Sequence, residues 1–241
     1  FSISGNSYSM ILDQTTLTEM RANGLIIGGH DYTVTGVTVE TTGSVKYDFK
    51  AAKNEFTLDD AVTDGTWANR FMKSDLEKIV PYLQQLQQAN IPVLWRPLHE
   101  AAGKWFWWGN GSATSYVKLW RFMYDYFKAK GINNLIWVWT SEKADSDWYP
   151  GDDYVDIIGT DMYGQDGTAV SATAMADRFN TLAYRYPTKM ISLTECGTVS
   201  DVPTQWNSDA KWSWFMPWYG STHATDDWWK AAINSEYVIT R

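Results

Sequence analysis

The chain alternates continuous apolar runs of strand length with segments whose apolar residues recur at helical spacing. The runs stay apolar over consecutive positions instead of alternating with polar ones, which is typical of parallel strands covered on both faces. The candidate strands are residues 24–29, 92–98, 134–140, 154–163, 189–195 and 212–220.

Three amphipathic segments between these runs predict helices. Segment 74–90 begins with Ser74 as its predicted cap, and Pro81 inside it predicts a kink. Segment 114–131 ends with basic residues and a glycine, and segment 171–187 stops at a proline, so both have ordinary helix ends.

Strand and helix in repeated order predict an α/β fold with parallel strands and right-handed crossovers. A doubly wound sheet and a (β/α)8 barrel share this order, but no glycine-rich phosphate loop follows any strand. Polar residues instead gather just after strand ends, as at His30, Glu100, Asp161 and Glu195. The carboxyl ends of barrel strands share the face that carries the active site. We therefore expect a (β/α)8 TIM barrel in a single catalytic domain over residues 1–241.

The strand count falls short of the eight that such a barrel needs. Residues 1–4 have the character of the tail of another strand, and segment 33–50 alternates like an exposed hairpin and is interpreted as a loop excursion. The expectation is a barrel that lacks its first strand or strands in this chain.

Composition narrows the classes of ligand and partner that the protein is expected to bind. The chain of 241 residues has 15 Trp and 14 Tyr, which predicts either a ring-rich core or a groove whose rings stack on sugars. The net charge of −8 disfavours nucleic acid as a partner. No run of apolar residues is long enough for a membrane span, and Phe1 opens without the regions of a signal peptide.

Glu100 and Glu195 each end a strand that should be buried, so a parallel barrel would bring both carboxylates to one rim. Two carboxylates on one rim are what cleavage of a glycosidic bond requires. Arg96 lies among apolar residues and needs a carboxylate partner, either Glu195, which it would keep ionised, or a structural partner elsewhere. Cys196 is interpreted as a small buried residue.

Four sequence blocks, in this order, resemble glycoside hydrolase family 26, which is best known for β-mannanases on a (β/α)8 barrel. They are RPLHE, WFWWG, GTDMYG and LTECG. The resemblance implies a retaining enzyme with Glu100 as acid/base and Glu195 as nucleophile, their carboxyl groups ~5–5.5 Å apart. It also implies that residues 24–32 contain the third barrel strand.

The resemblance further implies residues that bind the sugar or support the two carboxylates. These are His30, Arg96, His99, Trp105, Asp161 and Tyr163. Trp107 and Trp108 follow Trp105 too closely for all three rings to face a groove, so at least one should be in the core. Alternation along 212–220 predicts that Trp214 or Trp218 forms the floor of the cleft, with Trp214 preferred.

The resulting expectation is an endo-acting, retaining glycoside hydrolase that cleaves β-1,4-mannosidic bonds in mannan, glucomannan or galactomannan. The alternatives are a mixed-linkage β-1,3-1,4-glucanase, a β-1,3-xylanase and a catalytically silent barrel that binds carbohydrate. The three His residues lack ligand spacing, so we expect no metal and no cofactor. A polysaccharide substrate implies secretion, and we expect a monomer without nucleic acid or membrane partners.

Overall fold

The computed structural model describes most of the chain from residue 56 onward, together with the backbone of four short N-terminal strands. The described residues are 56–165, 168–219 and 224–240, and β1 (Ser2–Ser4), β2 (Ser7–Ser9), β3 (Leu25–Ile27) and β4 (His30–Tyr32).

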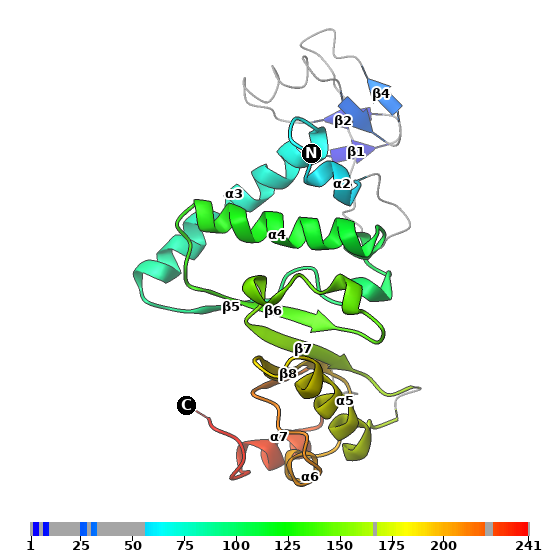
Figure 1. Cartoon of the computed structure of the whole chain (residues 1–241), viewed down its shortest axis with the longest axis vertical. Coiled ribbons are helices and arrows are strands. Elements are labelled where there is room, and N and C mark those ends of the chain that lie inside the picture. Colours follow the sequence, from blue (N-terminus) through cyan, green and yellow to red (C-terminus); the bar gives the residue numbers. More distant parts are fainter. Residues whose placement is uncertain are drawn as a thin grey trace.

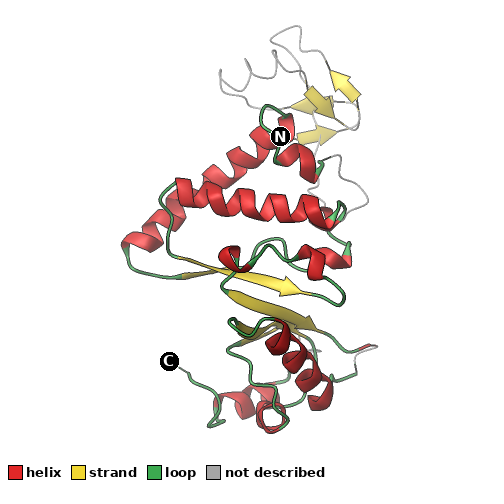
Figure 2. Ribbon diagram, in the orientation of Figure 1, coloured by secondary structure: helices red, strands yellow, loops and turns green. Residues whose placement is uncertain are grey.

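Five strands form one sheet, and each strand pairs in parallel with the strand that follows it in the chain (Figure 1, Figure 2). They are β5 (Val93–Trp95), β6 (Leu135–Ser141), β7 (Ile157–Met162), β8 (Met190–Cys196) and β9 (Phe215–Pro217). This sequential order is that of a barrel, because the strand order of a doubly wound sheet reverses partway across. The predicted (β/α)8-type fold is confirmed for these five strands.

Helices precede, connect and follow these strands. They are α2 (Leu58–Ala61), α3 (Trp67–Gln88), α4 (Ala113–Ala129), α5 (Ala172–Arg185), α6 (Val202–Asn207) and α7 (Asp226–Ile233). Figure 1 shows α3 and α4 together on one side of β5 and β6, and α5, α6 and α7 at the other end of the sheet. The predicted helices 114–131 and 171–187 are confirmed as α4 and α5.

The predicted start of the helix before β5 is wrong. Helix α3 begins at Trp67 and not at Ser74, because the Thr66 side chain accepts a hydrogen bond from the Asn69 amide and caps the helix about two turns earlier. The helix continues through Pro81. Ser74 and Glu77 have the spacing of a capping box, yet both lie in the interior of α3. This spacing alone therefore does not mark the start of a helix.

The predicted position of two N-terminal strands is also wrong. β3 pairs antiparallel with β4, and β1 pairs antiparallel with β2, instead of either joining the parallel sheet. In Figure 1 both hairpins lie beyond α2, away from β5. Two glycines separate β3 from β4 in the sequence, and such a pair favours a two-residue hairpin turn. The predicted loop excursion at 33–50 lies outside the described residues.

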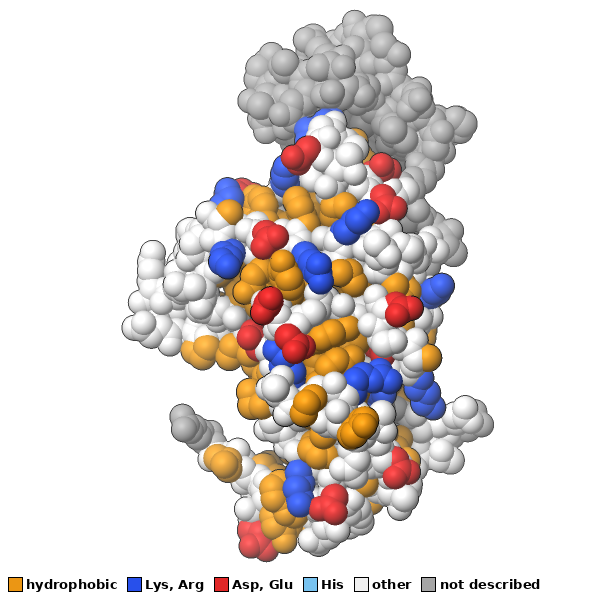
Figure 3. Space-filling view, in the orientation of Figure 1, with side chains coloured by type: hydrophobic (Ala, Val, Ile, Leu, Met, Phe, Trp, Pro, Cys, Tyr) orange, Lys and Arg blue, Asp and Glu red, His pale blue; other side chains and the backbone are white. Residues whose placement is uncertain are grey.

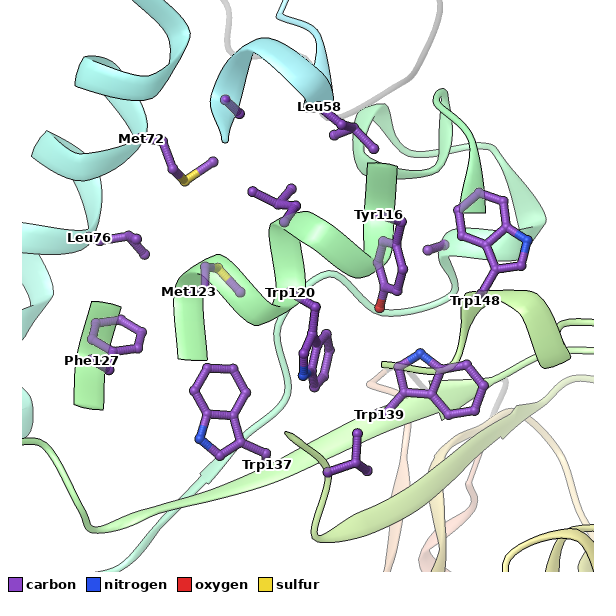
Figure 4. Packing of buried hydrophobic residues seen from close by; sticks show 14 of the residues in the cluster. Leu58, Met72, Leu76, Tyr116, Trp120, Met123, Phe127, Trp137, Trp139 and Trp148 are labelled. Atoms are coloured by element: carbon purple, nitrogen blue, oxygen red, sulfur yellow. The ribbon is translucent and has the colours of Figure 1, made fainter. Parts of the chain in front are cut away.

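The main core lies between α3, α4 and β6 and is rich in aromatic rings (Figure 4). Trp120 and Trp139 are fully buried there, and the Trp120 indole donates a hydrogen bond to the Tyr154 carbonyl at 3.0 Å. A buried indole needs such a partner for its N–H group. Part of the high Trp content is therefore explained by packing, whereas Trp105 and Trp218 remain 46% and 38% exposed.

The surface of the described part of the chain mixes charge types. On the face drawn in Figure 3, acidic and basic side chains are interspersed with exposed hydrophobic ones. Among the described helices, none has the length and apolar character required to cross a membrane.

Candidate active site

The candidate site lies at the carboxyl edge of the parallel sheet, where consecutive strands bring polar side chains together. Arg96 directly follows β5, Asp161 lies near the end of β7, and Glu195 lies near the end of β8. The pairing of Asp161 with Glu195 across β7 and β8 sets the two carboxylates side by side. The sequence prediction that these strand ends share one edge is confirmed.

Three carboxyl groups meet at this edge. Glu100, Asp161 and Glu195 each place one carboxylate oxygen within 4.8 Å of the other two. Retaining glycosidases hold their two carboxyl groups ~5–5.5 Å apart and inverting ones ~6.5–9.5 Å apart. The limit of 4.8 Å on the distance between the Glu100 and Glu195 oxygens is shorter than the inverting spacing and agrees with the retaining one.

The same three residues are the one group in the described part of the chain whose geometry could hold a metal ion. Arg96 already supplies positive charge to two of them. Its Nη1 lies 2.7 Å from Glu195 Oε1 and its Nη2 lies 2.6 Å from Asp161 Oδ2. The Arg96 guanidinium thus already acts as the counter-ion of two of the three carboxyl groups.

Arg96 connects three strands. Besides its two ion pairs, its Nε donates a hydrogen bond to the Thr140 hydroxyl at 2.9 Å. The guanidinium is mostly buried, at 14% side-chain exposure. The predicted pairing of Arg96 with Glu195 is present, and Asp161 and Thr140 are partners that the sequence did not indicate.

Asp161 is held in one orientation from both sides. While Arg96 binds Oδ2, the Thr194 hydroxyl donates to Oδ1 at 2.6 Å. Gly159 leaves room for that hydroxyl, since a Cβ there would lie 2.3 Å from Thr194 Cγ2. Burial raises the pKa of Asp161, as do the nearby charges of Glu195 and Glu100, whereas Arg96 and the Thr194 hydrogen bond lower it.

Glu195 is nearly fully buried and is surrounded by donors. Tyr163 donates its hydroxyl proton to Oε2 at 2.8 Å, on the opposite oxygen from Arg96. His99 Nε2 lies 3.6 Å from Oε1. Burial, followed by the charge of Arg96, lowers the pKa of His99 to about 4, so the imidazole is neutral near neutral pH.

Glu100 lies in a loop and not at the end of the strand itself. Strand β5 ends at Trp95, earlier than predicted, and Glu100 has a left-handed backbone conformation with φ of 52° just before the 3₁₀ helix Ala101–Gly103. Burial raises the pKa of Glu100, and the charges of Glu142 and Glu195 act in the same direction, whereas hydrogen bonds with Asp161 and Trp105 oppose the shift.

Trp105 lies against Glu100. Its indole donates to Glu100 Oε2 at 3.0 Å. Gly103 permits this placement, because a Cβ there would lie 2.1 Å from the Trp105 ring. As predicted, the neighbouring rings are not all in the groove, since Trp107 and Trp108 both pack against the core.

The two aromatic residues near β9 differ in position. Trp214 precedes β9, and its carbonyl accepts a hydrogen bond from Leu193, at a level below the carboxyl edge. Trp218 follows β9, and its amide bonds to the carbonyl of Cys196. The placement therefore favours Trp218, not Trp214, as the ring at the edge.

Two further expected residues are placed as follows. His30 begins β4, but its side chain lies outside the described part of the structure. Cys196 is fully buried and free, and burial raises the pKa of its thiol to about 12, which agrees with its interpretation as an unreactive core residue.

Sequence reasoning missed Glu142. It directly follows β6, between the Glu100 loop and Asp161 in strand order. Burial and the nearby Asp161 charge raise its pKa to about 7. The signal was the one used for the other residues, a polar side chain just after a buried strand, and it was present in the segment WTSE.

A carboxylate pair at the carboxyl edge of a sequentially wound parallel sheet is the arrangement of a glycoside hydrolase on a barrel. The family model for glycosyl hydrolase family 26 matches residues 28–240 of this chain. The chain belongs to glycosyl hydrolase family 26.

Several relatives are known as mannanases. Mannan endo-1,4-beta-mannosidase B of Piromyces sp is 36% identical over 183 residues, which are 76% of this chain and 31% of that protein. Mannan endo-1,4-beta-mannosidase of Thermothelomyces thermophilus is 39% identical over 174 residues, 69% of this chain and 34% of that protein. This chain thus spans about a third of the length of these curated relatives.

Among solved structures, this chain is also similar to proteins described as mannanases. The Prevotella bryantii endo-beta-mannanase/endo-beta-glucanase superposes with a TM-score of 0.74 at 41% identity, covering 80% of this chain and 31% of that one. A beta-mannanase from a symbiotic protist of the termite Reticulitermes speratus, complexed with gluco-manno-oligosaccharide, superposes with a TM-score of 0.71 at 38% identity, covering 84% of this chain and 63% of that one.

Proposed function

We propose that this site hydrolyses β-1,4-mannosidic bonds in mannan, glucomannan or galactomannan as an endo-acting, retaining mannanase. The observation that carries the proposal is the contrast between two carboxyl groups whose oxygens lie within 4.8 Å of each other. Arg96 and Tyr163 donate hydrogen bonds to the two oxygens of Glu195 and so orient its carboxyl group. Burial and nearby negative charge favour the protonated form of Glu100. Such a pair supplies one nucleophile and one acid.

The reaction proceeds in two displacements. Glu195 attacks the anomeric carbon and forms a glycosyl ester, while Glu100 transfers its proton to the departing glycosidic oxygen as the bond to that oxygen breaks. Glu100, now a carboxylate, then takes a proton from water. The water oxygen attacks the same carbon and displaces Glu195, so the product keeps the anomeric configuration of the substrate.

The surrounding residues orient the substrate and the nucleophile. Asp161 and the neutral His99 present hydrogen-bonding groups beside Glu195, suited to sugar hydroxyls. Trp105 and Trp218 expose their rings at the edge and offer flat surfaces for a pyranose. Arg96 acts through Glu195 by holding one of its oxygens.

The choice of mannan rests on the relatives, which carry that substrate in their names. A mixed-linkage β-1,3-1,4-glucanase is the second candidate and a β-1,3-xylanase the third. Mannose and glucose units differ only in whether the C2 hydroxyl is axial or equatorial, so few contacts separate the first two candidates. A polysaccharide does not cross a cell membrane, so the same proposal includes an extracellular enzyme. It also treats residues 1–241 as part of one catalytic domain that acts as a monomer.

The experiment that tests the function compares three polymers under one condition. Reducing-sugar release would be measured from galactomannan, mixed-linkage β-glucan and β-1,3-xylan, and the anomeric form of the first product would be followed by NMR. We expect release from galactomannan with retained configuration. Release from β-glucan alone would replace mannan as the substrate, inverted product would contradict the mechanism, and release from none would support a silent barrel.

The pH dependence offers a second prediction, on Glu142. Its negative charge raises the pKa of Glu100, so replacing it with the neutral Gln should lower that pKa. Glu100 must be protonated for the first displacement, so the alkaline limb of kcat/KM should move to lower pH, by less than about one unit. The measurement is kcat/KM on mannan across pH.

The control is Glu77→Gln, which removes the same charge from helix α3, where Glu77 pairs with Lys130. Its profile should match that of the unmodified chain. An unchanged profile in Glu142→Gln, or a shift to higher pH, would contradict the electrostatic link between Glu142 and Glu100.

A further inference from the structure

The loop that carries Glu100 has an unusual backbone. Leu98, Glu100 and Lys104 have φ values of 50°, 52° and 62°, three left-handed non-glycine residues within seven positions. Non-glycine residues rarely adopt this conformation, because the Cβ approaches the backbone. A run of them persists only where surrounding contacts hold the chain in place.

Two side-chain donors hold the carbonyls just before Glu100. The hydroxyl of Tyr116 donates to the Leu98 carbonyl at 3.2 Å, and the indole of Trp108 donates to the His99 carbonyl at 2.7 Å. These carbonyls belong to the two consecutive peptide groups that lead into Glu100. Fixing both peptide planes fixes the direction in which the Glu100 side chain leaves the backbone.

Both donors are themselves fixed by packing. Tyr116 lies in α4 at 1% exposure, and its hydroxyl also shares a hydrogen bond with Trp139 of β6. Figure 4 shows the Tyr116 ring among the core aromatic side chains, with its oxygen directed toward the sheet. The Trp108 ring stacks on Phe106, with centroids 4.3 Å apart and planes 17° from parallel.

We propose that Tyr116 and Trp108 are positioning residues for proton transfer by Glu100, and that they act by clamping the Leu98 and His99 carbonyls. The inference rests on the proposed function. Neither residue touches the reacting atoms. Their effect is to keep the Glu100 carboxyl where it meets the glycosidic oxygen, and a displacement of about 1 Å can cost up to ~10²-fold in rate.

A purely structural role for the two residues predicts a different pattern. Loss of core packing would lower stability and would reduce turnover of every substrate alike. Displacement of the Glu100 carboxyl group lowers the rate only of reactions whose leaving group must be protonated. A 2,4-dinitrophenyl leaving group departs as a stable anion, so the first displacement on it proceeds without help from Glu100.

The experiment uses Tyr116→Phe and Trp108→Phe, each of which removes one donor and keeps an aromatic ring. For both variants kcat/KM would be measured on a manno-oligosaccharide and on the 2,4-dinitrophenyl glycoside of the same sugar chain. We expect a loss of about 10-fold or more on the oligosaccharide, carried by kcat with KM unchanged, and a change below about 2-fold on the dinitrophenyl glycoside.

The matched control is Tyr126→Phe. Tyr126 lies on the same helix, and its hydroxyl donates to the Glu77 carboxylate, away from the Glu100 loop. It should leave both rates unchanged. Equal losses on both substrates in Tyr116→Phe and Trp108→Phe, or no loss on either, would overturn the inference.

A second readout is independent of activity. Trp105 donates to Glu100, so the NMR signal of its indole N–H reports the position of that carboxyl group. The signal should shift in Tyr116→Phe and Trp108→Phe and stay unchanged in Tyr126→Phe, and an unmoved signal in the first two would overturn the inference. If the unmodified chain cleaves neither substrate, the proposed function fails, and the Trp105 signal alone decides the role of the clamp.

Discussion

Replacement of Glu195 by alanine is expected to lower kcat on galactomannan by about 10³-fold or more. The carboxylate that would attack the anomeric carbon is removed, and the two groups that orient it, Arg96 and Tyr163, are left around an empty space. Binding should be affected far less than turnover, because the nucleophile forms its bond to the sugar only during reaction.

Added azide separates loss of the nucleophile from loss of the fold. In Glu195→Ala, azide can enter the space of the missing carboxylate and attack the sugar of a 2,4-dinitrophenyl glycoside, giving a glycosyl azide of inverted configuration. In Glu100→Ala, azide should replace the water of the second displacement and give the retained configuration. NMR of the products distinguishes the two, and the reverse pattern would exchange the assigned roles of Glu100 and Glu195.

Replacement of Arg96 by methionine is expected to lower both activity and stability by large amounts. Its partners Asp161 and Glu195 have side-chain exposures of 1% and 6%, so the change leaves two buried carboxyl groups without their shared cation. Breaking a buried pair in this way costs about 3–5 kcal/mol of unfolding free energy. Chemical denaturation of the variant and the unmodified chain measures this difference.

The loss of stability should depend on pH. Without Arg96, burial and the neighbouring charge raise the pKa of Asp161 in the folded protein further above its value of about 3.9 in the unfolded chain. The folded variant then binds more protons than the unfolded one, so its stability falls as pH rises above that unfolded value. Arg96→Met should accordingly be less impaired near pH 4–5 than near pH 7–8.

Arg121→Met provides the matched control. Arg121 is exposed, and its guanidinium donates to the carbonyl oxygen of Pro150 at 2.9 and 2.7 Å and not to carboxylates. Its loss leaves no charge without a partner and should cost about 1–3 kcal/mol. If Arg96→Met loses no more unfolding free energy than this control, and loses the same amount at both pH values, the ion pairs of Arg96 with Asp161 and Glu195 contribute little to stability.

The sequence predicted the carboxyl edge of the sheet as the site, and it predicted many of the polar side chains that meet there. Continuous apolar runs predicted the parallel strands, and polar residues at their ends predicted the meeting of Glu195 with Arg96, which is present. The reason is that strand period and burial are local properties of the chain. Side-chain partners across strands, such as Thr140 and Thr194, depend on register and therefore stayed hidden.

The remaining errors have physical causes. The left-handed residues around Glu100 carry no glycine or asparagine signal, so a longer strand was expected where β5 ends at Trp95. The apolar run at β3 has the composition of a buried strand of a parallel sheet. Composition does not determine which strand it pairs with, and β3 pairs antiparallel with the neighbouring β4.

The bridge made by Arg96 also bears on the order in which the protein folds. Arg96 and Glu195 are 99 residues apart in the chain, so their contact is far from local. A chain that emerges during synthesis exposes the guanidinium long before its second carboxylate exists, since the strands that supply its partners follow in the order β6, β7 and β8. The site can therefore close only after β8 has docked, so the meeting of its carboxylates reports a late stage of sheet formation and not its start.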